Sequence, residues 1–220
     1  MKIVYLIAGL LIFFKMLLIT PANSERLDFN VVKAIIDDAG IPNTVSAIIL
    51  RNRLYDTVFE VTVFTIAIMG VGYLLANEMP SLKILQFRDI PSIVLARLGA
   101  TISALVGIEL AIRGHLSPGG GFAAGVAGGT AIGLVAITSS TEMMESIYKK
   151  WKASVWEKIS VIVFVIISIF FLIGLELGKG EFGALFSGGW ITILNILVAV
   201  KVTLGSWAAI LLFIRYRGLL

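Results

Sequence analysis

The segment Arg113-Gly-His-Leu-Ser-Pro-Gly-Gly-Gly-Phe122 separates two apolar runs that are each long enough to cross a bilayer. Because proline and consecutive glycines interrupt helices, this segment predicts a turn at a membrane boundary. The run after the turn carries glycine at every fourth position, at Gly121, Gly125, Gly129 and Gly133. In a helix this spacing puts the four glycines on one face, where a neighbouring helix can approach almost backbone to backbone. The segment and the run after it therefore predict closely packed membrane helices.

The composition favours the same class of protein. The chain is 58% hydrophobic and its mean hydropathy is +0.99, well above that of an ordinary soluble domain. It has no cysteine, which excludes disulfides and thiolate-held zinc or iron–sulfur sites, and a single histidine argues against a transition-metal site. We therefore expect no metal and no cofactor bound by this chain. The net charge of +4 is interpreted as an orientation signal of loops beside membrane lipid, not as a nucleic-acid-binding surface.

Six segments reach the roughly 20 apolar residues that a spanning helix needs, at about 3–20, 56–76, 92–113, 120–140, 155–177 and 190–214. Residues 1–20 resemble a signal peptide but lack a small-residue cleavage site before a soluble domain, so they predict a retained first helix. Two shorter amphipathic runs, at 29–36 and 45–50, are expected to lie at the interface or to re-enter the membrane partly. The fold class predicted is an all-α integral membrane protein with about six transmembrane helices.

The loops predict the topology and the division of the chain. Lysine and arginine are more frequent on the side that holds both termini, which places the termini in the cytoplasm of a multi-pass cell-membrane protein. Residues 1–80 form a two-helix part and residues 81–220 a four-helix part. No convincing internal repeat is present, so the inverted-repeat pattern of a self-sufficient secondary transporter is missing.

Charged residues inside predicted spans carry the functional hypothesis, because each costs roughly 2.5–3.5 kcal/mol at the bilayer centre unless it is paired or hydrated. Asp56 and Glu60 share a helix face at i, i+4 spacing. Two carboxylates in a low dielectric repel each other, and a proton or a sodium ion can settle their charge. The alternative is that Glu60 forms a structural ion pair with Arg51 or Arg53.

Lys201 lies too deep in the last span for easy contact with the headgroups, and a buried lysine can exchange a proton with a carboxylate. The alternative is a structural pair with Glu109, which can instead pair with Arg113 one turn away. His115 titrates near neutral pH and can gate a proton at the membrane surface, although a lone loop histidine more often packs or caps. The residues predicted for ion translocation are thus Glu60, Asp56, Lys201, Glu109 and His115.

Two motifs resemble a known family. Arg113-Gly-His115, followed by Pro118-Gly-Gly-Gly-Phe122 and a glycine-rich helix, resembles the hallmark of the B subunit (MnhB/MrpB) of multisubunit sodium/proton antiporters. The resemblance covers roughly residues 85–218, and the segment Asn195-Ile-Leu-Val-Ala-Val-Lys201 is similar to the final helix of archaeal members. The earlier segment Arg53-Leu-Tyr-Asp-Thr-Val-Phe-Glu60 resembles the C-terminal end of the large A subunit. The chain thus resembles a fusion of that tail with a B subunit, in agreement with the two-plus-four division.

The resemblance implies a non-catalytic accessory subunit that works with other antiporter-like membrane subunits (A, C, D and small subunits). Such modules occur in archaeal membrane-bound hydrogenase, sulfane-sulfur reductase and formate hydrogenlyase complexes, where a redox arm with iron–sulfur subunits drives the membrane arm. The resemblance also implies Na+ or H+ as the transported ion, and it assigns the important acidic residue of the family to Glu60. Two alternatives stay open: a structural scaffold without ion contact, and an autonomous transporter or channel.

Overall fold

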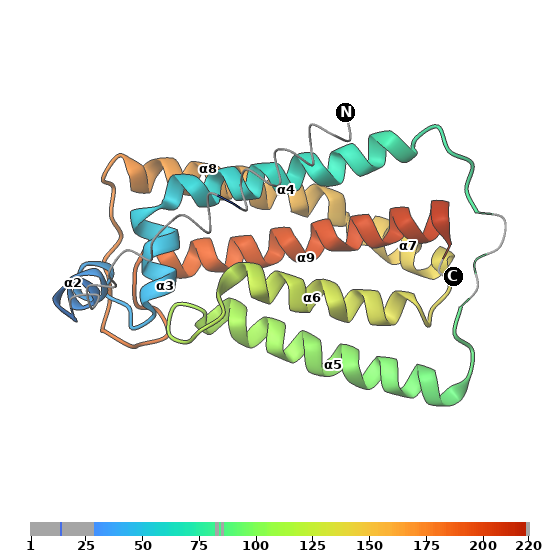
Figure 1. Ribbon diagram of the computed structural model, residues 1–220, viewed down its shortest axis with the longest axis horizontal. Coiled ribbons are helices and arrows are strands. Elements are labelled where there is room, and N and C mark those ends of the chain that lie inside the picture. Colours follow the sequence, from blue (N-terminus) through green and yellow to red (C-terminus); the bar gives the residue numbers. More distant parts are fainter. Residues whose placement is uncertain (1–13, 15–28, 82–83, 85, 219–220) are drawn as a thin grey trace. The chain divides into compact units, whose positions relative to one another are not determined.

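The computed structural model describes residues 14, 29–81, 84 and 86–218. Throughout these residues the regular elements are helices (Figure 1). Four of them are long and apolar enough to cross a membrane: α4 (Leu54–Leu75), α5 (Ile90–Arg113), α8 (Ala153–Leu172) and α9 (Trp190–Arg217). The prediction of an all-α, multi-pass membrane protein is confirmed. Of the predicted span 3–20, all residues except residue 14 lie outside the described residues.

The remaining helices are shorter. They are α2 (Phe29–Ala39), α3 (Thr44–Ala47), the π-helix η1 (Ile48–Asn52), α6 (Gly120–Ala136) and α7 (Thr141–Lys150). The apolar α6 ends at residue 136 and not at the predicted 140. Ser140 caps the next helix instead, because its Oγ accepts a hydrogen bond from the backbone N–H of Met143 at 3.2 Å. The chain separates into a unit of residues 1–34 and a unit of residues 35–220, and the second unit contains α3, η1 and α4 to α9.

The predicted span 155–177 is five residues too long at its end. Helix α8 ends at Leu172, and Gly174 follows with a φ of +86°, a left-handed conformation that favours glycine. The backbone N–H of Leu175 then donates to the carbonyl oxygen of Phe170 at 3.0 Å, which closes the helix end. The apolar residues after Gly174 therefore belong to a loop, although their hydropathy alone predicts a longer helix.

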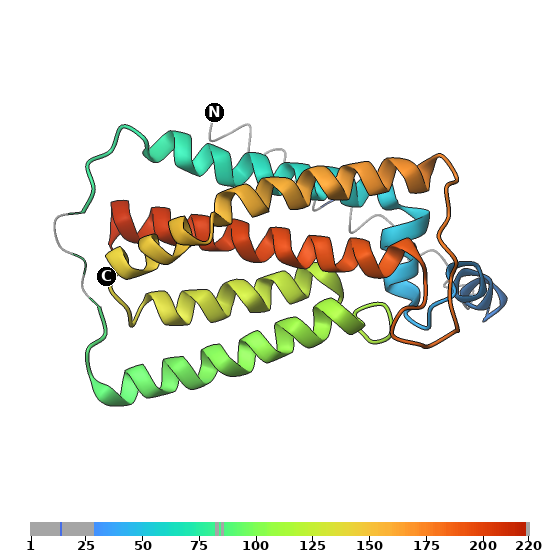
Figure 2. The same cartoon turned by 180° about the vertical axis from the view of Figure 1, so that it is seen from behind.

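Helix α9 is the centre of the second unit. It contacts α4 and α8 on one side and α5 and α6 on the other (Figures 1 and 2). Its apolar residues Leu194, Val198 and Val202 are buried, together with Phe164 of α8 and Val61 of α4. Because α9 contacts helices on both sides, a site between these helices is lined by α9 residues.

The glycine face of α6 lies against α9. A Cβ atom built on Gly121 would lie 2.3 Å from the backbone oxygen of Asn195, and one on Gly125 would lie 2.4 Å from Cβ of Val202. On the same face, a Cβ of Gly129 would lie 2.7 Å from Cβ of Ser206, and a Cβ of Gly133 would lie 3.4 Å from Cδ1 of Ile210. Three of these positions leave no room for a side chain, so the first three turns of α6 require glycine to pack this closely.

Candidate functional site

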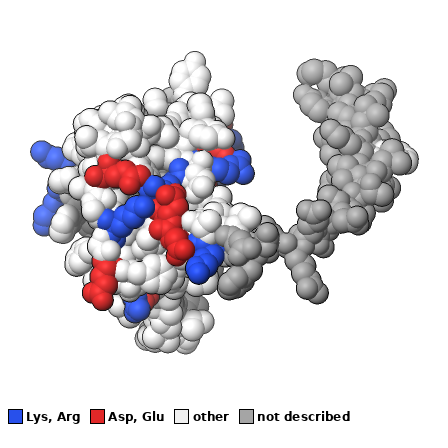
Figure 3. All heavy atoms as spheres, turned by 90° about the vertical axis from the view of Figure 1, so that its left-hand side faces the viewer, with Lys and Arg blue, Asp and Glu red and all other residues white. Residues whose placement is uncertain are grey.

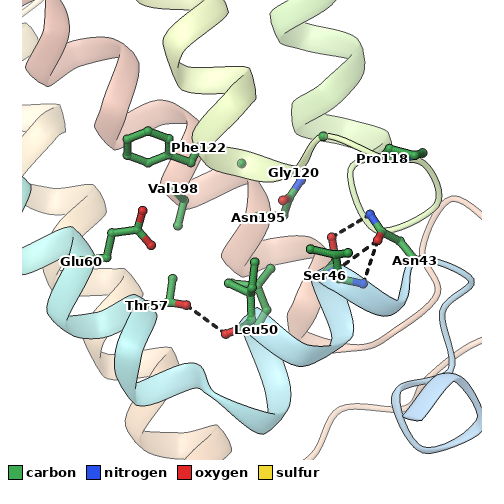
Figure 4. Close-up of a pocket in the computed structure, with 14 residues that line it drawn as sticks. Asn43, Ser46, Leu50, Thr57, Glu60, Pro118, Gly120, Phe122, Asn195 and Val198 are labelled. Atoms are coloured by element: carbon green, nitrogen blue, oxygen red, sulfur yellow. Dashed lines mark hydrogen bonds between the residues drawn. The ribbon is translucent and has the colours of Figure 1, made fainter. Parts of the chain in front are cut away.

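A cavity of about 390 Å³ lies at the end of the bundle where α4, α6 and α9 begin (Figure 4). Its wall combines the segment around α3 and η1, the first turns of α4, the turn before α6, and α9. The lining residues are Asn43, Val45, Ser46, Ile49, Leu50, Thr57, Glu60, Pro118, Gly119, Gly120, Gly121, Phe122, Asn195 and Val198. The structure thus brings the Pro118–Phe122 turn and Glu60 together, although more than 50 residues separate them in the sequence.

Glu60 is an exposed side chain of α4 that lines this cavity. Its carboxylate is directed into the space next to Phe122 and Val198 (Figure 4). Among the residues that the structure describes, it has no hydrogen bond and no ion pair. A carboxylate without a cationic neighbour among these residues is open to interaction with an ion or with water in the cavity.

The predicted alternative, in which Glu60 pairs with Arg51 or Arg53, is wrong. Nε of Arg53 lies 2.6 Å from Oδ2 of Asp56, which is only one helical turn away and therefore reaches the guanidinium first. Within the described part of the chain, Asp56 is therefore ion-paired with Arg53, whereas Glu60 is unpaired.

Arg51 turns away from α4 and joins two other segments. Its Nε lies 2.6 Å from Oδ2 of Asp38, and its Nη2 lies 2.7 Å from Oε1 of Glu176. The hydrogen bond from Arg51 holds the pKa of Asp38 below its ordinary value. Figure 3 views this end of the molecule, where acidic and basic side chains lie next to one another. The ion pairs fix η1 to the end of α2 and to the loop before α9.

Two polar residues of the α3 N-terminus hold the turn that follows α5. Nδ2 of Asn43 donates to the carbonyl oxygens of Gly114 and Ser117, at 2.7 Å each. Oγ of Ser46 donates to the same carbonyl of Gly114 at 2.7 Å. These hydrogen bonds position the glycine run of the turn as one wall of the cavity.

Asn195 of α9 completes the wall and is only 1% exposed. Its Nδ2 donates to the carbonyl oxygens of Leu110 (3.2 Å) and Ala111 (2.8 Å), which lack helical partners because α5 ends there. Its Oδ1 is buried and has no hydrogen-bond partner within the described part of the chain. The sequence analysis did not predict this residue as part of a site.

A buried ion pair lies deeper in the bundle. Nζ of Lys201 is 3.1 Å from Oε1 of Glu157, and the two side chains are 1% and 9% exposed. The predicted alternative partner, Glu109, is wrong because Glu109 lies 3.2 Å from Arg113 on the exposed face of α5. Sequence reasoning missed Glu157, although it is the single acidic residue of the apolar helix α8, and that isolation was the available signal.

Phe64 connects the buried pair with the cavity. Its ring centroid lies 4.2 Å from Nζ of Lys201, within the range of a cation–π contact. The same ring packs edge-on against Phe122, a cavity-lining residue, with centroids 6.3 Å apart. Gly205 leaves the space for this contact, since a Cβ there would lie 2.7 Å from the Phe64 ring. Glu60 and Phe64 are one turn apart on α4, so a row of contacts leads from the cavity to Lys201.

His115 lies in the turn between α5 and α6 and is fully buried. Neither ring nitrogen forms a hydrogen bond of acceptable geometry with a described residue. Burial lowers the pKa of His115, and the backbone groups of Ala184 and Leu185 oppose this effect only in part. The imidazole is therefore neutral at pH 7.

The oxygen atoms around the cavity come from a carboxylate, an amide and hydroxyl groups, which are hard donors suited to Na+ or to water. No three His, Cys, Asp or Glu side chains gather into a metal-ion site within the described ranges. The site is therefore an open recess with largely apolar walls and a few oxygen donors, in which the Glu60 carboxylate is unpaired among the described residues. A buried ion pair lies further inward.

The sequence and the fold are similar to those of known proteins. The family model described as a domain related to the MnhB subunit of Na+/H+ antiporter matches residues 91–208. A chain of the membrane-bound sulfane sulfur reductase (MBS), an archaeal respiratory membrane complex, has a similar structure. Its TM-score is 0.72 at 26% identity, with 97% of this chain and 98% of that chain covered. A chain of the Mrp complex from Dietzia sp. DQ12-45-1b shares the fold, with a TM-score of 0.66 at 19% identity; the alignment covers 95% of this chain and 25% of that chain. No curated protein matches the sequence.

Proposed function

Because the chain belongs to the family of domains related to the MnhB subunit of Na+/H+ antiporters, we propose that it is a non-catalytic accessory subunit of a multisubunit antiporter module. The module moves Na+ or H+ across the cell membrane, both chain termini are cytoplasmic, and this chain binds no cofactor. Its partners are other antiporter-like membrane subunits (A, C, D and small subunits). The likeness over nearly the full length of a chain of the sulfane sulfur reductase, a respiratory membrane complex, supports a place in a respiratory complex. An iron–sulfur redox arm is part of the same proposal.

The two motifs at the cavity support the further proposal that the chain is a fusion. Residues 1–80 correspond to the end of an antiporter A subunit and residues 81–220 to a B subunit. The cavity lies where these parts meet, since Glu60 and Thr57 come from the first and the Pro118–Phe122 turn from the second. A recess that holds a carboxylate and several oxygen donors at such a junction is where an ion is proposed to enter.

The observation that carries the proposed function is the carboxylate of Glu60 in the cavity, which has no ion pair with any residue that the structure describes. An uncompensated charge at a membrane helix is costly, and it persists where water or a transported cation can reach it. Glu60 is proposed to attract the cation, and Lys201 with Glu157 to form the charged end of the row that starts at the cavity. We assign supporting roles to Asp56 and Glu109, whose charges are offset by neighbouring arginines, and to His115, which packs the turn.

The test is Glu60→Gln in the complete complex, reconstituted in liposomes. Gln keeps the size of the side chain but removes its charge, so coupled Na+ transport is expected to be lost while the subunits still co-purify. Glu181→Gln is the matched control, because Glu181 is an exposed loop acid away from the cavity. Normal transport by the Glu60→Gln complex would refute the proposed role.

The second candidate function is a scaffold without ion contact. The ion pairs of Arg51 with Asp38 and Glu176 favour it, because they tie three segments of the chain together. For a scaffold, neutralising Glu60 would leave transport per assembled complex unchanged, and neutralising Arg51 would reduce the amount of assembled complex. The two candidates are thus separated by measuring transport and assembly on the same preparations.

A further inference from the structure

The side-chain amide of Asn195 has only one orientation that its surroundings accept. Both neighbours of Nδ2, the carbonyl oxygens of Leu110 and Ala111, are acceptors, so the NH2 group must face them. The oxygen Oδ1 is consequently directed to the other side, towards the cavity that Asn195 lines (Figure 4). There it is buried without a partner among the described residues. A buried amide oxygen needs a donor or a cation.

A second oxygen atom, Oγ of Ser46, borders the same space as Oδ1 of Asn195. The position that a Cβ atom of Gly120 would take lies 3.7 Å from Oδ1 of Asn195 and 4.0 Å from Oγ of Ser46. Gly120 has a φ of +86°, so it keeps this position open and its backbone conformation disfavours any side chain. Ser46 is 6% exposed. Its hydroxyl donates to Gly114 and accepts a hydrogen bond from Nδ2 of Asn43 at 2.9 Å, which leaves one oxygen lone pair to bind a cation.

The charge of the cavity indicates a monovalent cation. Glu60 supplies a single carboxylate without a counter-ion in the described part of the chain. The first turn of α6 also borders the cavity, and no side chain of the described residues caps its N–H groups. The partial positive charge of a helix N-terminus disfavours any cation, and it disfavours a divalent ion more than a monovalent one. Amide, hydroxyl and carboxylate oxygens together suit a hard cation.

We propose that Oδ1 of Asn195 and Oγ of Ser46 bind a partly hydrated Na+ ion next to Gly120, with Glu60 supplying the balancing charge. The inference rests on the proposed function, in which Glu60 faces the transported ion, and it makes Na+ the occupant of this cavity. Asn195 and Ser46 replace part of the hydration shell of the ion, whereas Glu60 attracts it. Loss of a neutral ligand therefore weakens Na+ binding without removing transport.

The experiment measures Na+ uptake by the reconstituted complete complex as a function of Na+ concentration. Ser46→Ala is expected to raise the Na+ concentration for half-maximal uptake by about fivefold, the factor typical of one lost polar contact, with the maximal rate retained. Asn43 still donates to Gly114 in this variant, so the turn keeps a hydrogen bond. Ser46→Thr retains the hydroxyl and is expected to behave like the unmodified complex. Ser117→Ala is the matched control, because that hydroxyl bonds to Arg113 and does not line the cavity.

The outcomes separate this inference from the proposed function. An unchanged half-saturating concentration in Ser46→Ala, together with lost transport in Glu60→Gln, would mean that the space holds water only, and it would overturn the inference alone. Failure of Ser46→Ala to assemble while Ser46→Thr works would assign the hydroxyl to the turn and would also overturn it. Normal transport by Glu60→Gln would remove the proposed function itself.

Discussion

Nζ of Lys201 and Oε1 of Glu157 lie 3.1 Å apart in a part of the bundle where both side chains are buried. One belongs to α9 and the other to α8, and the ring of Phe64 from α4 lies against the ammonium. The interaction thus joins the three helices on one side of the unit. A buried pair of this kind is not by itself a large source of stability, because removing both charges from water offsets most of their attraction.

Removing one partner of this pair has a larger effect than removing both. Lys201→Met leaves Glu157 charged and unpaired in a low dielectric, and we expect a loss of about 3–5 kcal/mol in stability. Lys201→Met combined with Glu157→Gln is expected to recover most of that loss. Thermal unfolding of the detergent-solubilised complex measures both. Equal losses in the two variants would show that water solvates the pair.

The double variant also tests function. With the stability restored, Na+ transport is expected to stay low if Lys201 and Glu157 exchange a proton during transport. Transport at the rate of the unmodified complex would make the pair purely structural.

The glycine face of α6 is expected to tolerate no methyl group at Gly125. A Cβ there would lie 2.4 Å from Cβ of Val202 and 3.0 Å from the backbone oxygen of Ala199, so α6 and α9 must separate. Gly125→Ala is predicted to cost about 1–3 kcal/mol, as overpacking usually does. Gly70→Ala is the control, since none of the described residues lies within 4 Å of its Cβ and alanine favours the helix. Unfolding midpoints that rank the two variants in the opposite order would contradict the packing described.

Acidification is expected to destabilise the turn that contains His115. Its folded-state pKa is lowered by burial, so the unfolded chain binds a proton more readily than the folded chain. The contribution of the neutral, buried imidazole is complete above the ordinary His pKa of 6.5 and is lost progressively as the pH falls below that value. The unfolding midpoint, compared between pH 7.5 and pH 5, is therefore predicted to fall more in the unmodified protein than in His115→Gln. Equal pH dependence would show that the histidine is solvated.

The sequence alone predicts the helices well but not their mutual contacts. Hydropathy places α5 and α9 within three residues of their observed bounds, because a bilayer requires long apolar runs. It overextends α8, since Gly174 ends a helix whose apolar composition continues. The four glycines of α6 identify its packing face, but the spacing does not tell which helix packs there.

For the site as well, the sequence predicts the residues but not their contacts. Glu60 and the Pro118–Phe122 turn are recognisable as motifs, but their shared cavity depends on hydrogen bonds from Asn43 and Ser46 to residues about 70 positions away. The partner of Lys201 depends on the depth and rotation of α8 relative to α9, which the periodicity of a single helix does not determine. Only the structure identifies Oδ1 of Asn195 as unpaired among the described residues, because it shows that the NH2 group donates to the last carbonyl oxygens of α5.

The central claim is that the negative charge of Glu60 draws Na+ into the cavity. It is tested most directly by the initial rate of Na+ uptake into liposomes that contain equal amounts of complete complexes with Glu, Asp or Gln at position 60. The account predicts that Glu60→Asp, which keeps the charge, retains a measurable part of the uptake and that Glu60→Gln retains none. Equal uptake by all three complexes would contradict the account.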